Sequence, residues 1–171
     1  YISAGSWEKW RPDADEFPAE VLGKPLEGWP GERWLDIRRI DILGPIMTAR
    51  MDLCKEKGFD GIEPDNIDGY INDTGFPLTY QDQVNYNIFL ANEAHVRGLS
   101  IGLKNDLDQV EDLLPYFDWA LNEQCFQYEE CNALMPFINA GKAVFQVEYY
   151  LKLRSFCPLA SRLNFNSIKK H

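Results

Sequence analysis

Acidic residues crowd into one short segment of the chain, GFDGIEPDNIDGY, residues 58–70. Glu63, Asp65 and Asp68 lie within six residues of a segment that otherwise resembles the end of a buried strand. Burial of an unpaired carboxylate is costly, so such a group shifts its pKa or acquires a partner. The segment is therefore a functional site, a set of carboxylates with counter-ions, or not a buried strand at all.

Polar residues recur at the carboxyl ends of five predicted strands. They are Asp36 in RWLDIR, Glu63 and Asp65 in GIEPDN, Lys104, Asn105 and Asp106 in GLKND, Asn122 and Glu123 in ALNEQ, and Gln146 and Glu148 in VFQVEY. Enzymes with parallel sheets assemble their sites at the carboxyl ends of the strands. Because alternate residues share one face of a strand, we expect several of these carboxylates to converge.

Two carboxylates whose pKa values differ are the groups that hydrolyse glycosidic bonds. One is ionised and acts as nucleophile or base, and the other keeps a proton for the leaving oxygen. Asp65 and Glu123 are our candidates, and the alternative for each is a structural ion pair or a helix cap. We interpret Glu63 as a supporting residue paired with Lys104. Aromatic residues could offer surfaces for sugar stacking, although tryptophans more often pack in cores or loops; they are Trp7, Trp10, Trp29, Trp34, Tyr70 and Tyr149.

Helices and strands alternate along the chain. Apolar residues at helical spacing predict a helix over residues 42–54, ended by Gly58, and a second helix capped by Thr79 and ended by Gly98. Further helical segments follow Asp106 and cover residues 128–140. The predicted strands are residues 1–4, 34–37, 59–65, 99–105, 119–126 and 143–148, and residues 6–33 are interpreted as an ordered loop. This alternation predicts an α/β fold with a parallel sheet.

Charge and residue counts exclude several classes of function. The net charge of −10 argues against binding to nucleic acid or anionic membranes and suits a cationic ligand. The sequence contains no run of 18 apolar residues, so it predicts no membrane span. Two histidines are too few for a histidine-rich metal site, and DNIDGYINDTG misses the ligand spacing of an EF-hand, so we expect no metal or other cofactor.

Four cysteines occur, and none forms a CxxC pair. Cys125 and Cys131 bracket a predicted loop and could close a short disulfide in a secreted protein. The alternative is a set of buried free thiols, which includes Cys54 and Cys157.

Long ordered blocks of the chain resemble glycoside hydrolase family 114. They are YISAGSWEKWRPDADEFP, LGKPLEGWPGERWLDIR, GFDGIEPDNIDGY, TGFPLT, GLKNDLDQV, ALNEQCFQYEEC and KAVFQVEY, and they extend from residue 1 to about residue 149. The resemblance implies a TIM-type (β/α)8 barrel with endo-α-1,4-polygalactosaminidase activity. The family's barrel has two strands before YISAG, so we expect one partial domain over residues 1–171 that lacks the first two strands and could be inactive by itself.

The resemblance also assigns roles to residues. Asp65 matches the nucleophile and Glu123 the acid/base, and we expect a retaining mechanism with carboxyl groups about 5 to 5.5 Å apart. The expected substrate-binding residues are Asp36, Glu63, Asn66, Lys104, Asn105, Asn122, Gln146, Glu148 and Tyr149. The expected partner is a cationic galactosamine-containing polysaccharide, and the protein is expected to be a secreted monomer. The alternatives are a carbohydrate-binding barrel without turnover and a metal-assisted carbohydrate deacetylase.

Overall fold

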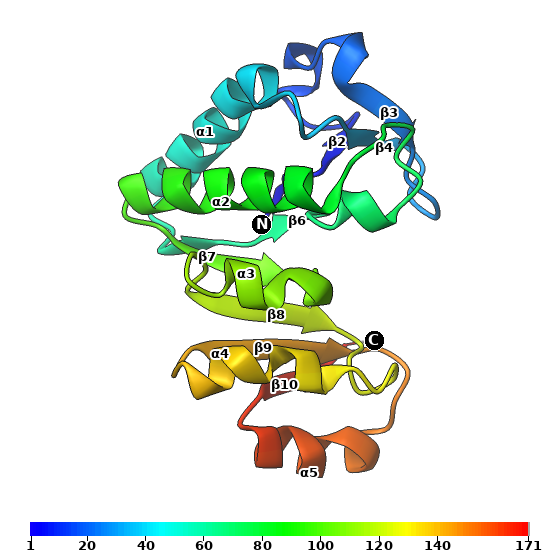
Figure 1. The fold of residues 1–171 in the computed structure, drawn as a ribbon, viewed down its shortest axis with the longest axis vertical. Coiled ribbons are helices and arrows are strands. Elements are labelled where there is room, and N and C mark those ends of the chain that lie inside the picture. Colours follow the sequence, from blue (N-terminus) through cyan, green and yellow to red (C-terminus); the bar gives the residue numbers. More distant parts are fainter. Residues whose placement is uncertain (171) are drawn as a thin grey trace. The chain divides into compact units, whose positions relative to one another are not determined.

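The computed structural model describes residues 1–170 (Figure 1). The chain forms two compact units, which we call unit 1, Tyr1–Ile101, and unit 2, which begins at Gly102. Each unit is described by itself. The expectation of a single domain stays a prediction. No helix within residues 1–170 is long and apolar enough to cross a membrane.

Unit 1 opens with a strand that pairs with the acidic segment. Strand β1 (Ile2–Ser3) runs parallel to β6 (Pro64–Asp65), and Ser3 lies opposite Asp65. The predicted strand over residues 59–65 is interrupted at Glu63, which separates β6 from β5 (Gly61–Ile62). β5 pairs in parallel with Ser100 and Ile101, the first residues of β7 (Ser100–Lys104).

A three-stranded antiparallel sheet occupies the segment that we interpreted as a loop. Strand β4 (Glu32–Leu35) lies between β2 (Ser6–Glu8) and β3 (Leu22–Pro25). The interpretation of residues 6–33 as a loop was wrong, as was the inclusion of residues 34–37 in the parallel sheet. Strands of three or four residues carry too little periodicity to stand out among the Trp, Pro and Gly residues that surround them.

Two long helices complete unit 1, and both predicted helices are confirmed. Helix α1 (Ile40–Glu56) buries Leu43, Met47 and Met51, and α2 (Tyr80–Val96) packs against it (Figure 1). Thr79 caps α2 through a capping box with Asp82. The unit also contains the 3₁₀ helices η1 (Ala14–Glu16), η2 (Ala19–Val21) and η3 (Gly69–Ile71).

Unit 2 is a parallel sheet in which helices connect successive strands. From its segment of β7 the order is β7, β8 (Trp119–Glu123), β9 (Ala143–Glu148) and β10 (Asn166–Lys169). The connections contain η4 (Leu107–Gln109), α3 (Val110–Leu113), η5 (Cys131–Leu134), α4 (Met135–Asn139) and α5 (Leu153–Leu163). Figure 1 shows α4 alongside β9, with which it makes contact.

The predicted α/β class, with parallel strands that alternate with helices, is confirmed. Helix α5 and strand β10 were not predicted from the sequence. β10 reads NSIK, and its residues alternate between exposed and half-buried, so no apolar pattern marks it as a strand. β10 is stabilised by its pairing with β9 along four residues and not by a local apolar pattern.

Candidate functional site

Asp65 lies at the end of β6 and is held by donors from two directions. Its Oδ2 accepts a hydrogen bond from Tyr1 Oη at 3.0 Å, and its Oδ1 accepts one from the backbone N–H of Asn66 at 3.0 Å. The Asp65 carbonyl accepts the N–H groups of Ala4 and Gly5. A Cβ on Gly5 would lie 1.6 Å from the carbonyl oxygen of Asn66, so this close approach requires glycine.

A chain of hydrogen bonds connects the Asp65 turn with the antiparallel sheet. Asn66 has a left-handed backbone with φ of 60°, and its Nδ2 donates to Ser6 Oγ at 2.9 Å. Ser6 Oγ in turn donates to Glu32 Oε2 at 2.8 Å. Asn66, a predicted substrate-binding residue, therefore supports the turn through its amide.

Glu8 and Glu32 form an acidic pair that the sequence analysis missed. They lie opposite each other on β2 and β4, and only 4% and 6% of their surfaces are exposed. Arg11 Nε donates to Glu8. Burial raises the pKa of Glu32, the hydrogen bond from Ser6 opposes that rise, and the carboxylates of Glu8 and Asp65 add to it. Because residues 6–33 were interpreted as a loop, we did not expect Glu8 and Glu32 to lie opposite each other on paired strands.

We call Asp65, Glu8 and Glu32 the unit 1 acid cluster. Tyr1 responds to it, since desolvation and the neighbouring Asp65 raise the pKa of the Tyr1 hydroxyl. The hydroxyl therefore keeps its proton and donates a hydrogen bond to Asp65. Within residues 1–170, no group of His, Cys, Asp and Glu side chains has the arrangement of a metal site.

Asp36 and Glu63 lie in different settings. Asp36 is buried and makes a bidentate ion pair with Arg38, at 2.7 Å for each oxygen. It follows the antiparallel strand β4, so its expected place at the end of a parallel strand is wrong. Glu63 is half-buried between β5 and β6, and its carbonyl accepts the N–H of Ile2. Its pairing with Lys104 stays a prediction.

The tryptophans divide into exposed and packed residues. Trp10 and Trp29 are 54% and 62% exposed, next to the ends of β2 and β4 where Glu8 and Glu32 lie. Trp34 is buried in the core, and Trp7 donates its indole N–H to the carbonyl of Ala14. Only Trp10 and Trp29 of these four offer open ring surfaces for a sugar.

Glu123 lies at the end of β8 in unit 2, and each of its carboxylate oxygens contacts a neighbouring side chain. Tyr149 Oη donates to Oε1, and Lys104 Nζ lies 3.5 Å from Oε2. The backbone N–H of Glu123 donates to Asn105 Oδ1 at 2.9 Å. The Lys104 side chain is 6% exposed and that of Glu123 is 33% exposed, so the carboxylate is reachable while its cation is not.

The register of the parallel strands decides which predicted residues share a face with Glu123. Lys104 lies opposite Leu121, and Glu123 lies opposite Val147, so Lys104 and Tyr149 share the Glu123 face. Asn122 lies opposite Gln146, and Glu148 is two residues further along the same strand.

Asn122, Gln146 and Glu148 therefore lie on the opposite face from Glu123. They are 1%, 1% and 0% exposed. We expected these residues to line sugar subsites with Glu123, and the structure instead turns them into the interior of unit 2. For Asn122 the cause is alternation along β8, since it directly precedes Glu123. For Gln146 and Glu148 the cause is the register of β9, which local sequence does not specify.

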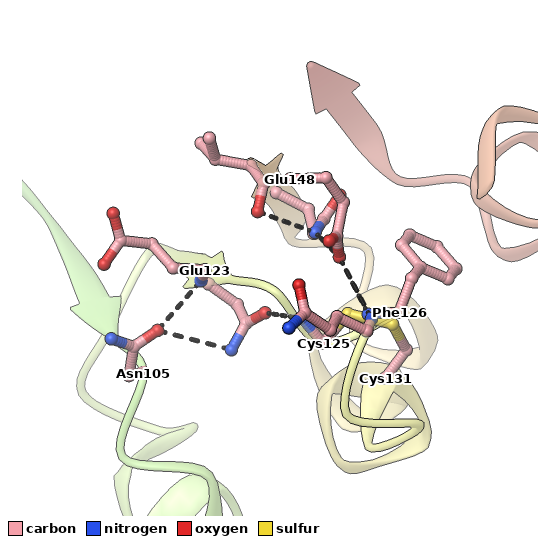
Figure 2. The surroundings of a disulfide bond; sticks show 10 residues. Asn105, Glu123, Cys125, Phe126, Cys131 and Glu148 are labelled. Carbon is pink, nitrogen blue, oxygen red and sulfur yellow. Dashed lines mark hydrogen bonds between the residues drawn. A yellow bond between two sulfur atoms is a disulfide. The ribbon is translucent and has the colours of Figure 1, made fainter. Parts of the chain in front are cut away.

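Two of these buried side chains, those of Asn122 and Glu148, bind the loop that follows Glu123, and Gln146 binds Glu148; Figure 2 shows Glu148 beside Phe126 of the loop. Asn122 Oδ1 accepts the N–H of Cys125 at 2.9 Å. Glu148 Oε1 accepts the N–H groups of Phe126 at 3.0 Å and Gln127 at 3.4 Å, together with Gln146 Nε2 at 2.8 Å. The side chains thus act on the main chain of the loop.

A disulfide joins Cys125 to Cys131, with their Cα atoms 4.8 Å apart (Figure 2). Of the two alternatives for these cysteines, the structure has the disulfide. Cys54 and Cys157 are half-buried free thiols. The cross-link closes the loop that begins directly after Glu123.

Comparisons with known proteins agree with this architecture. The model of the glycoside-hydrolase family GH114 matches residues 1–171. The crystal structure of Aspergillus fumigatus Ega3 in complex with galactosamine is 42% identical, with a TM-score of 0.94, and the match covers 100% of this chain and 73% of that one.

A second solved structure shares the fold at low identity. The glycoside hydrolase domain of PelA from Pseudomonas aeruginosa is 14% identical, with a TM-score of 0.68, and the match covers 99% of this chain and 76% of that one. No curated protein matched. The likenesses confirm the predicted TIM-type α/β fold class. With a family match along its whole length and a 42% identical relative, the chain belongs to glycoside hydrolase family GH114.

Proposed function

We propose that this protein is an endo-acting glycoside hydrolase that cleaves α-1,4-linked galactosamine polymers. The observation that carries the proposal is the 42% identity, over the whole chain, to a protein solved with galactosamine. Membership of a glycoside hydrolase family makes hydrolysis of a glycosidic bond the reaction, and the relative's ligand suggests the sugar.

In the proposed mechanism Asp65 is the nucleophile and Glu123 is the acid/base. Asp65 attacks the anomeric carbon, and Glu123 protonates the leaving oxygen and then activates a water, with retention at the anomeric carbon. Support comes from the accessible half-buried position of each carboxylate at a strand end. The donors Tyr1 and Tyr149 fix the orientations of the two groups.

The acidic character of unit 1 suits a polycationic substrate. A polymer of galactosamine carries an ammonium group on each sugar, and the net charge of the chain is −10. We propose that Glu8, Glu32 and Asp65 attract ammonium groups and that Trp10 and Trp29 stack on sugar rings. Glu63 and Tyr149 remain candidates for direct sugar contact, whereas the buried Lys104 would act through its ion pair with Glu123.

We also propose that the protein is secreted and monomeric. The Cys125–Cys131 disulfide supports an oxidising compartment, because disulfides persist outside the reducing cytosol. A polysaccharide substrate fits the same location.

The test is digestion of a partially deacetylated galactosamine polymer, with products identified by mass spectrometry. The 171-residue chain is compared with a version extended at its N-terminus by the two barrel strands expected from the family. Asp65→Asn and Glu123→Gln are made in the active form, with the exposed residues changed in Asp15→Asn and Glu111→Gln as matched controls.

Galactosamine oligomers from the parent and the controls, but not from Asp65→Asn or Glu123→Gln, support the proposal. Proton NMR of the first product gives its anomeric configuration and tests retention. A folded protein that binds the polymer without cutting it overturns the catalytic proposal and leaves a carbohydrate-binding barrel in its place.

A further inference from the structure

We propose that Glu148 is a positioning residue for Glu123, which it holds in place through the main chain of the loop at residues 124–131. The inference rests on the proposed function, since it gives Glu123 the role of acid/base. Glu148 is 0% exposed and its side chain lies on the opposite face of the sheet from Glu123, so it acts through the main chain of the loop and not by direct contact.

The loop leaves β8 immediately after Glu123 and is anchored at successive points. Gln124 N–H donates to the carbonyl of Val147 at 2.8 Å, and Cys125 N–H donates to Asn122 Oδ1. Glu148 Oε1 then accepts the N–H group of Phe126 (Figure 2) and that of Gln127. One buried carboxylate oxygen therefore fixes the middle of the loop.

The backbone of the loop needs such anchors. Gln124 has φ of 69° and Glu129 has φ of 59°, both in the left-handed region that residues with a Cβ seldom adopt. Strained backbone of this kind persists only where its surroundings hold it. Gln124 is the neighbour of Glu123, so a relaxation of the loop rotates the peptide that carries the catalytic side chain.

The second oxygen of Glu148 indicates that stability alone does not explain the residue. Among residues 1–170, Glu148 Oε2 has no hydrogen-bond partner although it is buried. A buried carboxylate with an unsatisfied oxygen is a poor way to stabilise a fold. The oxygen that is satisfied, Oε1, is the one that faces the loop.

Two substitutions of Glu148 distinguish the effect of its hydrogen-bond acceptor from the effect of its negative charge. Glu148→Gln keeps an oxygen acceptor for Phe126 and Gln127 and removes the charge, whereas Glu148→Leu keeps the approximate volume and removes the acceptor. We expect Leu to lower kcat by about 10- to 100-fold with KM changed less than about threefold, because a misplaced acid/base affects the chemical step. We expect Gln to restore kcat to within about threefold of the parent value.

If the Glu148→Leu variant does not fold, Glu148→Asp takes its place in the experiment. It retains the carboxylate but withdraws it by one methylene, and we expect it to lower kcat as well. Glu130→Leu is the matched control, since Glu130 is an exposed glutamate of the same loop. All rates are expressed per folded molecule, measured by circular dichroism, because a purely structural Glu148 would change the folded fraction and leave that rate unchanged.

Hydrogen–deuterium exchange gives a readout that does not need activity. The Phe126 and Gln127 amides should exchange slowly in the parent and in Glu148→Gln, and faster in Glu148→Leu or Glu148→Asp. If the parent does not hydrolyse the polymer, the proposed function fails and the exchange still tests the anchor. Faster exchange with unchanged kcat per folded molecule, or slow exchange in every variant, overturns the inference.

Discussion

Asp65 in unit 1 and Glu123 in unit 2 are carboxylates at the ends of short parallel strands, yet their surroundings differ. Asp65 has other carboxylates as neighbours, and the nearby Arg11 is bound to Glu8. Glu123 has a buried lysine 3.5 Å from one oxygen. Each carboxylate accepts a hydrogen bond from a tyrosine hydroxyl, from Tyr1 at Asp65 and from Tyr149 at Glu123.

The supports of the two groups also differ. In unit 1 an extra antiparallel sheet places Ser6, Glu8 and Glu32 beside the Asp65 turn. In unit 2 a cross-linked loop follows Glu123, and buried side chains bind its backbone. In both units the strand end gives the carboxylate its location. The charge beside Asp65 comes from the added antiparallel sheet, whereas the charge beside Glu123 comes from Lys104 on the neighbouring strand β7.

The largest effect should come from separating the two chemical roles. Asp65→Asn and Glu123→Gln should each lower kcat on the polymer by at least about 100-fold. On an aryl galactosaminide with an acidic leaving group, which needs no protonation, Glu123→Gln should still release an initial burst of phenol, and Asp65→Asn should not. Stopped-flow absorbance measures the burst. A burst from Asp65→Asn but not from Glu123→Gln would show that Glu123 is the nucleophile and Asp65 the acid/base.

Removal of the disulfide should affect the unit that contains it. Cys125→Ser with Cys131→Ser should lower the free energy of unfolding by about 2 kcal/mol, because the cross-link restricts the unfolded chain over a short loop. Urea denaturation checks this, and the free thiol changed in Cys157→Ser serves as the control. An equal loss in the control would show that the cross-link itself contributes nothing.

The two tyrosines offer a matched pair of smaller changes. Tyr149→Phe removes a hydrogen bond to a carboxylate in a half-buried position and should lower kcat by about tenfold. Tyr1→Phe removes the corresponding bond to Asp65, but Tyr1 is 55% exposed, so water can replace the hydroxyl and the loss should be about threefold or less. Steady-state kinetics of both variants side by side test the order, which a larger loss for Tyr1→Phe would reverse.

The smallest effect should appear in the pH dependence of stability. The folded-state pKa of Glu32 is raised, so the folded protein binds this proton more tightly and its stability declines as pH rises through that pKa. Glu32→Gln should therefore raise the melting temperature slightly at pH 7 and have little effect at pH 4. Thermal melts at both pH values provide the measurement, and Glu27→Gln, an exposed position, is the control. Stabilisation that is greatest at pH 4 would contradict the assignment.

Much of the fold was readable from local sequence. Thr79 as an N-cap and the glycines Gly58 and Gly98 marked limits of two helices that the structure confirms to within a few residues. The strand end at Asp65 was placed correctly, whereas the strand predicted over residues 119–126 ends at Glu123. Elements with few residues and no apolar pattern, such as β2, β3 and β10, were missed because their stability comes from pairing.

Within the candidate site, the residue types and the strand ends were determined by the sequence itself, since caps, turns and apolar runs are local properties. The tertiary structure alone decided which side chains meet. The fold of one loop brought Cys125 and Cys131 together in a disulfide. Cross-strand pairing joined Glu8 to Glu32 and placed Glu148 away from Glu123. The physical reason is register, because contacts between distant segments depend on how strands align, and a shift of one residue reverses every side chain.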